Sequence, residues 1–268
     1  MSFSIAGKRI LVTGGVGGVG GGSVRHFARE GANIVALDIR DEEGMLLAKE
    51  ATEAGPGQVT YRRMDASSTI DIRESIEWAV DHLGGLDGIL TAHGGPILSW
   101  AAETPESDWD WQLMVNAKAV GTICQAVFPH LKDNGGGSIV NIAAGGALKD
   151  GPIKTSSYSA SKGAVLSYTR SIALEWAPYK IRANCVNPVV ATPKDDQIQA
   201  LMTPEERERF RRQIHESIPL GHMGDVETEL APALQFLLSD AAKFVTSQIW
   251  GIDGGLCPAA NPPRSSTL

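Results

Sequence analysis

Two side chains suited to proton transfer, Tyr158 and Lys162, stand four residues apart in the segment YSASK. In a helix this spacing places the phenol and the ammonium next to each other on one face. A neighbouring cation favours the phenolate, so we expect the tyrosine pKa, ordinarily about 10, to fall toward the range of a working general acid or base. The spacing alone is common in helices, and the pair gains its meaning from the motifs around it.

A glycine-rich run from Thr13 to Gly20, with the sequence TGGVGGVG, offers a place for phosphate groups. It follows a short apolar run and precedes a segment with the periodicity of an amphipathic helix. Glycines there permit positive φ angles and let the backbone approach a pyrophosphate, whose charge then meets the free N–H groups of the helix N-terminus. We expect a dinucleotide-binding loop; a plain loop and the cofactor turn of a methyltransferase are the alternatives.

Two aspartates stand at the ends of the next two predicted strands. Asp38 follows the glycine run at a distance where a carboxylate can accept hydrogen bonds from both hydroxyls of an adenosine ribose. A 2′-phosphate would meet a like charge there, so we expect NAD; Arg40, two residues on, is the feature that favours NADP. Asp65 is placed to meet the adenine amino group. The alternative for both aspartates is structural, as caps of the helices that follow.

Short β-branched runs alternate with longer amphipathic stretches along almost the whole chain. Such alternation predicts βαβ units, and right-handed crossovers then leave helices on both faces of a parallel sheet. We therefore expect an α/β protein with a doubly wound, Rossmann-type sheet of about seven strands and a ligand crevice at the strand carboxyl ends. The predicted strands are Arg9–Val12, Asn33–Leu37, Val59–Met64, Gly88–Ala92, Ser138–Ile142, Arg182–Val186 and Ile249–Ile252.

The chain shows no repeat or linker, so we expect a single NAD-binding catalytic domain over residues 1–257. Residues 189–225 are a long, polar and partly helical interruption between the last two strands, which is typical of a mobile substrate lid. Residues 258–268, rich in proline, serine and alanine, are predicted to form a loosely held tail.

Composition and charge exclude several classes of protein. Hydrophobic residues make up 43% of the 268 residues, enough for one large core. A net charge of −7 gives no basic field for a phosphate backbone or an anionic membrane, so neither nucleic acid nor membrane is expected as a partner. Three isolated cysteines and scattered histidines predict neither disulfides nor a metal site. The apolar run near the N-terminus is too short for a signal segment, and we expect a cytoplasmic location.

These motifs resemble the short-chain dehydrogenase/reductase family, in its shorter single-domain form, over nearly the whole chain. The resemblance implies that Tyr158 donates or accepts the substrate proton, that Lys162 holds the nicotinamide ribose and that Asn116 anchors a water relay. A satisfied polar group at a helix irregularity is the alternative for Asn116. The family also implies a homotetramer. The motifs that carry the resemblance are the Thr13–Gly20 loop, Asp38, Asp65, Val115-Asn116-Ala117, Tyr158/Lys162, Asn187-Pro188, FLLSD at 236–240 and IDGG at 252–255.

By the same resemblance, defined sets of residues surround the cofactor and a small alcohol or ketone substrate. Cofactor contacts are expected from Thr13, Gly14, Val16, Gly17, Gly18, Val19, Gly20, Asp38, Ile39, Asp65, Ala66, Ala92, His93, Gly94, Tyr158, Lys162, Pro188, Val190 and Thr192. Substrate contacts are expected from Pro96, Ala144, Gly145, Leu148, Ile153 and Tyr158, with Ile97, Leu98 and Trp100 near the crevice.

The sequence departs from the family pattern at the catalytic serine, where alignment on Asn141-Ile142 puts Ala144. Loss of one preorganised donor of this kind lowers the rate on the order of 10²–10³-fold. A replacement hydroxyl from Thr155 or Ser156, a backbone N–H of the Gly145-Gly146 turn, and a second polar group of the substrate are open alternatives.

Two further departures concern the cofactor. His93 stands in a turn that is usually rich in asparagine, where it either contacts the cofactor and titrates near neutral pH or packs as a hydrogen-bonded structural histidine. Pro188-Val189 lacks the glycine that normally follows the proline, which shifts the expected contacts of Val190 and Thr192 with the nicotinamide amide.

Three functions of different kinds fit the sequence. The leading one is reversible hydride transfer between NAD and a secondary alcohol or ketone, on an alicyclic or aromatic-ring substrate because the expected crevice is apolar. The second is a catalytically weakened dinucleotide-binding protein with a sensing or scaffolding role, prompted by Ala144. The third is a methyltransferase, which the Tyr158/Lys162 pair argues against. Trp109 and Trp111 are interpreted as interface or core residues.

Overall fold

A seven-stranded, fully parallel sheet organises the molecule, as the sequence predicts. The computed structural model describes residues 3–147, 153–193, 199–200 and 202–256. The strands are β1 (Arg9–Thr13), β2 (Asn33–Asp38), β3 (Gln58–Arg63), β4 (Gly88–Thr91), β5 (Gly137–Ile142), β6 (Ile181–Pro188) and β7 (Ile249–Ile252). They lie in the order β3-β2-β1-β4-β5-β6-β7, which confirms the doubly wound Rossmann arrangement.

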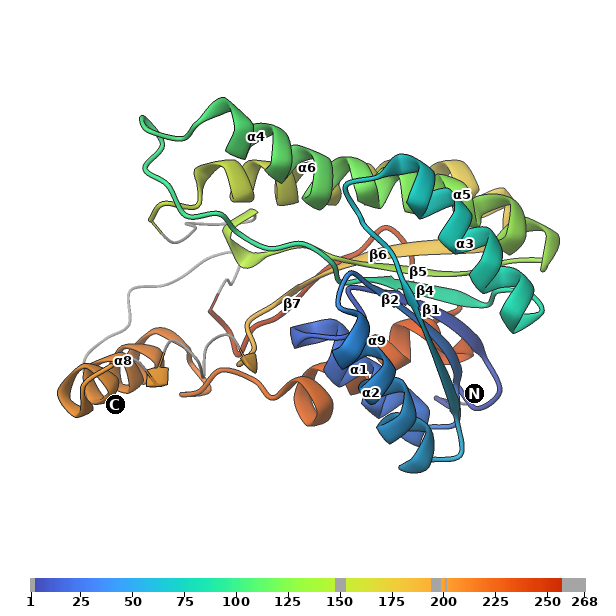
Figure 1. Ribbon diagram of the computed structural model, residues 1–268, viewed down its shortest axis with the longest axis horizontal. Helices are drawn as coiled ribbons and strands as arrows, with labels where there is room; N and C mark the ends of the chain where they lie inside the picture. The colour runs from blue at the N-terminus through green and yellow to red at the C-terminus, as the bar shows by residue number, and fades with distance from the viewer. Residues whose placement is uncertain (1–2, 148–152, 194–198, 201, 257–268) are drawn as a thin grey trace.

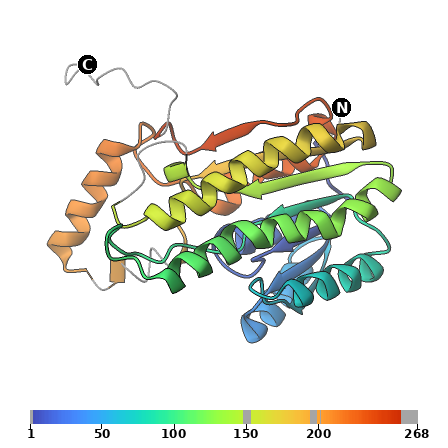
Figure 2. The same ribbon diagram turned by 90° about the horizontal axis from the view of Figure 1, so that it is seen from above.

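Helices cover both faces of this sheet (Figure 1). One layer contains α1 (Gly18–Arg29), α2 (Asp41–Glu53) and α9 (Ala231–Leu238). The opposite layer contains α3 (Thr69–Leu83), α5 (Ala119–Asp133) and α6 (Ser156–Trp176). On that same side, α4 (Glu106–Leu113) continues through a π-helical turn, η1 (Met114–Lys118), into α5, and Figure 2 shows α4, α5 and α6 running across the sheet.

Alternation of side chains along the central strands builds the two cores. In β1, Ile10 and Val12 belong to the core under α1, α2 and α9, whereas Leu11 between them belongs to the core under α3, α5 and α6. All three are fully buried, and each contributes roughly 1.5–3 kcal/mol by leaving water. The continuous apolar run that predicted this strand therefore reflects a sheet covered on both sides.

The strand order fixes where a ligand can bind. β1 pairs with β2 on one side and with β4 on the other, so the connections after β1 and β4 leave toward opposite faces of the sheet. Such a reversal opens a crevice beyond the carboxyl ends of these strands. The glycine run follows β1, and the predicted catalytic residues follow β4 and β5.

In the described part of the expected lid, helix α8 (Pro204–Ser217) is set apart from the body and is visible at one end of the molecule in both views (Figures 1 and 2). A capping box begins this helix: the Thr203 hydroxyl accepts from the Glu206 N–H and the Glu206 carboxylate accepts from the Thr203 N–H. The helix buries none of its residues. A β-bridge between Val190 and Gly224 joins the two ends of the excursion. The predicted tail, 258–268, lies outside the described residues.

Cys124 and Cys185 are free and buried within the described chain. Among the helices of that part of the chain, none is long and apolar enough to cross a membrane.

Candidate functional site

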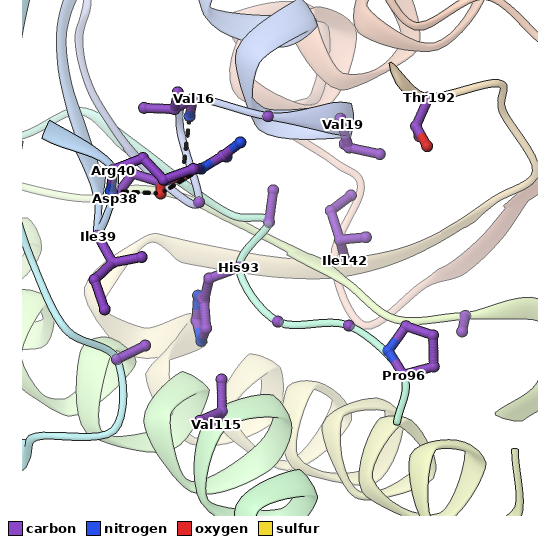
Figure 3. Close-up of a pocket in the computed structure, with 18 of the residues that line it drawn as sticks. Val16, Val19, Asp38, Ile39, Arg40, His93, Pro96, Val115, Ile142 and Thr192 are labelled. Carbon is purple, nitrogen blue, oxygen red and sulfur yellow. Dashed lines mark hydrogen bonds and ion pairs between the residues drawn. The ribbon is translucent and has the colours of Figure 1, made fainter. Parts of the chain in front are cut away.

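A cavity of about 1200 Å³ opens at the carboxyl ends of the strands. Figure 3 shows Asp38 and Arg40 on one side of it and Pro96 and Thr192 on the other. Segments that follow β1 to β6 all contribute to its wall, so the crevice predicted from the strand order is present. The wall contains Gly14, Val16, Gly17, Gly18, Val19, Leu37, Asp38, Ile39, Arg40, Glu43, Met64, Asp65, Ala66, Ser67, Ala92, His93, Gly94, Gly95, Pro96, Trp111, Val115, Ile142, Ala143, Ala144, Tyr158, Lys162, Pro188, Val189, Val190, Thr192, Pro193 and Met223.

The glycine loop forms one end of this wall, and close contacts explain two of its glycines. Gly14 has φ +65°, and a Cβ on it would lie 2.6 Å from the His93 Cα. A Cβ on Gly20 would lie 2.0 Å from the Gly14 carbonyl oxygen. Because α1 begins at Gly18, its first N–H groups lack partners within the helix and face the loop. This arrangement fits a pyrophosphate group.

Two residues of the predicted loop contacts do not line the cavity, because they lie behind its wall. Gly20 is buried against Gly14, and Thr13 is fully buried with its hydroxyl oxygen 2.7 Å from Nδ1 of His93. Both shape the loop from behind, and their direct contact with a cofactor stays a prediction.

Asp38 ends β2 at the side of the cavity where an adenosine ribose is expected. Its carboxylate accepts from the Val16 N–H at 3.2 Å, so it ties β2 to the glycine loop. Arg40 donates to both carboxylate oxygens, each at 3.1 Å, and the bond to Asp38 raises the pKa of the guanidinium. A Cβ on Gly17 would lie 2.4 Å from Nη2 of Arg40, so the guanidinium packs over the loop. Sequence alone did not predict this ion pair.

Asp65 and Ala66 line the cavity near the expected adenine position. Asp65 accepts from the Ser67 hydroxyl at 2.7 Å and from the Ser67 N–H at 2.8 Å, and these bonds lower the pKa of its carboxyl. The alternative interpretation of Asp65 as a helix cap is wrong, because Ser68 caps α3 by accepting from the Asp71 N–H. The backbone turn therefore leaves Asp65 at the cavity wall.

Tyr158 and Lys162 lie on the first turns of α6, and both line the cavity. The Lys162 ammonium is buried and donates to the Ile142 carbonyl at 3.0 Å, which fixes α6 to the end of β5. Burial lowers the pKa of Lys162 to about 8 and raises the pKa of Tyr158 to about 12. The expected fall of the tyrosine pKa is thus wrong for this structure, because burial of the phenol disfavours the charged phenolate.

Asn116 lies in the π-helical turn η1 and is fully buried behind the wall rather than in it. Its Oδ1 accepts from the Gly95 N–H at 3.0 Å, and its Nδ2 donates to the Gly95 carbonyl at 3.2 Å and to Oε1 of Gln112. The structure therefore shows the satisfied polar side chain at a helix irregularity that was the alternative for Asn116. Any role in a relay stays a prediction.

Ala144 lines the cavity at the position where the family carries a serine. The two candidate hydroxyls lie elsewhere: Ser156 is exposed, and the buried Thr155 hydroxyl is 3.4 Å from the Ser159 hydroxyl. Neither belongs to the cavity wall among the described residues. The choice between a backbone donor and a group on the substrate stays open.

Of the residues predicted to contact the substrate, some line the cavity and others do not. Pro96 and Tyr158 border the cavity with Ala144, whereas Gly145 and the 75% exposed Ile153 are not among its described wall residues. Leu148 lies outside the described residues. Leu98 and Trp100 are exposed and, like Ile97, absent from the described wall.

His93 lines the cavity and is also packed and hydrogen-bonded, with its ring directed toward Val115 (Figure 3). Burial lowers its pKa to about 3, and the Lys162 charge acts in the same direction. The hypothesis that it titrates near neutral pH is therefore wrong, because the interior favours the neutral ring. The packing and the bond to Thr13 agree with the structural interpretation of this histidine, and its contact with the cofactor stays a prediction.

Several wall residues were missed by sequence reasoning because distant segments bring them together. Met223 enters through the bridge between Val190 and Gly224, and Trp111, interpreted as a core or interface residue, borders the cavity instead. Gln112 was not singled out, although it is fully buried and bonded to Asn116. Its one sequence signal is a polar residue one helical turn before that asparagine.

Comparison with known proteins identifies the family. Residues 14–257 match the family model described as enoyl-(acyl carrier protein) reductase. The 3-oxoacyl-(acyl-carrier-protein) reductase FabG of Thermotoga maritima is 36% identical over 253 residues, which cover 94% of this chain and 98% of the relative. The NAD-dependent glycerol dehydrogenase of Listeria innocua is 30% identical over 254 residues, 94% of this chain and 95% of its own.

Solved structures agree with the sequence comparison. Levodione reductase superposes with a TM-score of 0.88 at 26% identity, covering 96% of this chain and 100% of its own. With the glycine loop, Asp38, Tyr158 and Lys162 around one cavity, these matches show that the chain belongs to the short-chain dehydrogenase/reductase family and is an oxidoreductase.

Proposed function

We propose that this protein is an NAD(H)-dependent oxidoreductase that interconverts a secondary alcohol and a ketone, with Tyr158 as the general acid and base. The observation that carries the proposal is that Tyr158 and Lys162 border the same cavity as the glycine loop and Asp38. A bound nicotinamide would supply or accept the hydride. The glycine loop, the free N–H groups of α1 and the carboxylate of Asp38 fit such a dinucleotide.

The protonation states in the site favour an acid role for the resting tyrosine. A Tyr158 pKa of about 12 keeps the phenol protonated at neutral pH, ready to donate to a developing alkoxide. Lys162, with a pKa of about 8, is still mostly charged at neutral pH and stabilises the phenolate that remains. In alcohol oxidation the same phenolate accepts the hydroxyl proton.

Asp38 supports NAD over NADP, as does the similarity to the NAD-dependent glycerol dehydrogenase of Listeria innocua. A 2′-phosphate would approach a buried carboxylate, whereas ribose hydroxyls can donate to it. Arg40 acts in the other direction, since its half-exposed guanidinium could leave Asp38 and pair with a phosphate. We expect NADH to raise the melting temperature of the wild type more than NADPH does, and Asp38→Asn to reduce the difference between the two cofactors. A larger rise with NADPH in the wild type would overturn the preference for NAD.

The proposed substrates carry an alicyclic or aromatic ring. Support comes from apolar residues in the wall of the cavity that Tyr158 borders, among them Pro96, Trp111, Ala144 and Met223. A flat or puckered ring can pack against such surfaces without leaving a polar group unpaired.

Activity tests the proposal directly. Ring alcohols and ketones are screened with NAD and NADH, followed by Tyr158→Phe, which should abolish turnover and leave cofactor affinity nearly unchanged. Tyr168→Phe is the matched control, because this tyrosine lies on the same helix and donates to the Gly121 carbonyl at 3.3 Å, outside the cavity wall. Unchanged turnover in Tyr158→Phe would contradict the assigned mechanism.

A second candidate, a weakened dinucleotide-binding protein with a sensing or scaffolding role, is favoured by one observation, the alanine at position 144. Ala144→Ser separates the two. A large gain on plain ketones, on the order of 10²-fold, means that the missing hydroxyl limits an enzyme. Cofactor binding without turnover in both forms favours the sensor.

Assembly and domain limits are further parts of the proposal. We expect a homotetramer, supported by the family and by exposed Leu113 and Leu174 on α4 and α6, and light scattering on the purified protein measures it. Residues 1–257 are proposed as one catalytic domain in the cytoplasm. Residues 189–225 are proposed as a substrate lid, because Val189 and Met223 border the cavity while α8 buries none of its residues.

A further inference from the structure

The segment after β4 forms one wall of the cavity although it has no helix or strand of its own. Gly95 exchanges two hydrogen bonds with the Asn116 side chain, at 3.0 and 3.2 Å. Farther along, the Ser99 N–H donates to the Lys154 carbonyl at 3.0 Å, and the Lys154 ammonium lies 4.9 Å from the centre of the Trp100 ring. The segment is therefore attached to η1 at one end and to the approach to α6 at the other.

Gln112 connects the middle of this segment to Asn116. It is 0% exposed, its Nε2 donates to the Ile97 carbonyl at 3.3 Å, and its Oε1 accepts from Nδ2 of Asn116. Both polar atoms of the amide are thus used, one on the backbone of the segment after β4 and one on the asparagine. A single buried side chain fixes the relative position of Ile97 and Asn116.

We propose that Gln112 is a positioning residue for the reaction: it holds Asn116 and the segment from Gly95 to Ile97 in the arrangement that the substrate meets at Tyr158. Gly95 and Pro96 of this segment border the cavity. The inference rests on the function proposed above.

Tight packing around Asn116 makes the position of its side chain consequential. A Cβ on Gly94, which has φ +98°, would lie 2.0 Å from Oδ1 of Asn116, so the wall backbone touches the amide directly. Trp111 and Val115, the neighbours of Gln112 and Asn116 in sequence, themselves border the cavity. A shift of this helical segment therefore moves both sides of the substrate pocket.

Two substitutions separate the hydrogen bonds of Gln112 from its volume. Gln112→Met fills similar space but makes neither bond. Gln112→Glu retains the shape: a protonated carboxyl donates to the Ile97 carbonyl and accepts from Asn116, whereas an ionised one cannot donate. Burial raises the pKa of such a carboxyl, so its protonated form is reached by mild acidification.

We expect Gln112→Met to lower kcat/KM about tenfold or more, since small misplacements near reacting groups carry effects up to about 10²-fold. NADH affinity should change little, because the glycine loop and Asp38 are untouched. The kcat/KM of Gln112→Glu relative to wild type should rise as pH falls, while the ratio for Gln112→Met stays flat. Gln235→Met is the matched control: its Nε2 also bridges to a backbone carbonyl, that of Phe3, at 3.1 Å, but far from the cavity.

Hydrogen exchange gives a readout that does not depend on activity. The Gly95 and Ser99 amides should exchange at least about tenfold faster in Gln112→Met than in wild type, and unchanged exchange overturns the proposal. Faster exchange with wild-type kcat, KM and pH profile also overturns it, because the residue would then be only structural. A third outcome separates this inference from the proposed function. If the wild type turns over no ring alcohol or ketone but the Gly95 and Ser99 amides still exchange faster in Gln112→Met, the proposed function is wrong. The positioning of the segment by Gln112 then still stands.

Discussion

Lys162 is a buried ammonium, and its replacement by methionine should reveal the energetic effect of that burial. A folded pKa of about 8 against an unfolded value near 10.5 means that the folded state disfavours the charged form. The difference of about 2.5 pKa units corresponds to about 3 kcal/mol at pH values well below 8. The Ile142 carbonyl, which accepts from Nζ at 3.0 Å, offsets only part of it.

The sign of the pH dependence follows from proton binding. Between pH 8 and 10.5 the unfolded lysine holds a proton that the folded one has released, so rising pH stabilises the wild type through this window. The gain from about pH 7 to about pH 9.5 amounts to about 2 kcal/mol from this group alone. Lys162→Met has no such group, so its free energy of unfolding relative to wild type should fall by that amount over the same range.

Denaturant unfolding of both proteins at the two pH values measures this double difference, in which contributions common to both proteins cancel. Lys132→Met, which removes an exposed lysine of α5, is the control, and its difference from wild type should stay constant. If the difference in free energy of unfolding between Lys162→Met and wild type is also the same at both pH values, the reasoning is refuted. The folded state would then not disfavour the charged form of Lys162.

The remaining predictions concern the loop, a distant ion pair and the exposed helix. Gly14→Ala should abolish the thermal shift by NADH, because the new Cβ meets the His93 backbone at 2.6 Å and the residue has φ +65°. Burial alone would raise the pKa of Asp87, but hydrogen bonds from Arg9 and Asn134 hold this pKa at about 2. Asp87→Asn should therefore lower the free energy of unfolding by about 2 kcal/mol at neutral pH. That deficit should shrink as pH falls from about 4 toward 2, since the wild type loses the same stabilisation there; urea titrations at both pH values measure it. Thr203→Ala should speed amide exchange in α8 and leave the global unfolding midpoint unchanged, because the capping box contributes about 1 kcal/mol to a helix that buries nothing.

Much of the fold could be predicted because its determinants are local. The strands were placed within one or two residues of their observed ends, since runs such as Ile10 to Val12 are apolar on both sides and end at turn residues. β6 was the largest difference, extending to Pro188, because pairing with β7 continues the ladder beyond the apolar run.

Some residues of the candidate site can be predicted from the local sequence, whereas others reach the site only through contacts with distant segments. Asp38 follows from its place at a strand end, and the glycine loop from its place between strand and helix. Trp111 reaches the cavity from α4, and Met223 lies beside the bridge that joins the ends of the excursion, so both depend on distant contacts. The bond from Gln112 to Ile97 spans fifteen residues across an irregular segment, and no periodicity encodes it.

The failed expectation at Tyr158 has a physical cause that also bears on the chemistry. The spacing of two residues along a helix predicts that a phenolate and an ammonium attract each other. It does not predict how deeply the fold buries each group. Burial disfavours each charge separately, as the raised pKa of Tyr158 and the lowered pKa of Lys162 both record. The two residues share one face of α6, where a charged Lys162 would offset part of the desolvation of a phenolate at Tyr158. The resting phenol therefore keeps its proton at neutral pH. In the mechanism proposed above, ketone reduction would start from that state, whereas alcohol oxidation would first have to remove the proton.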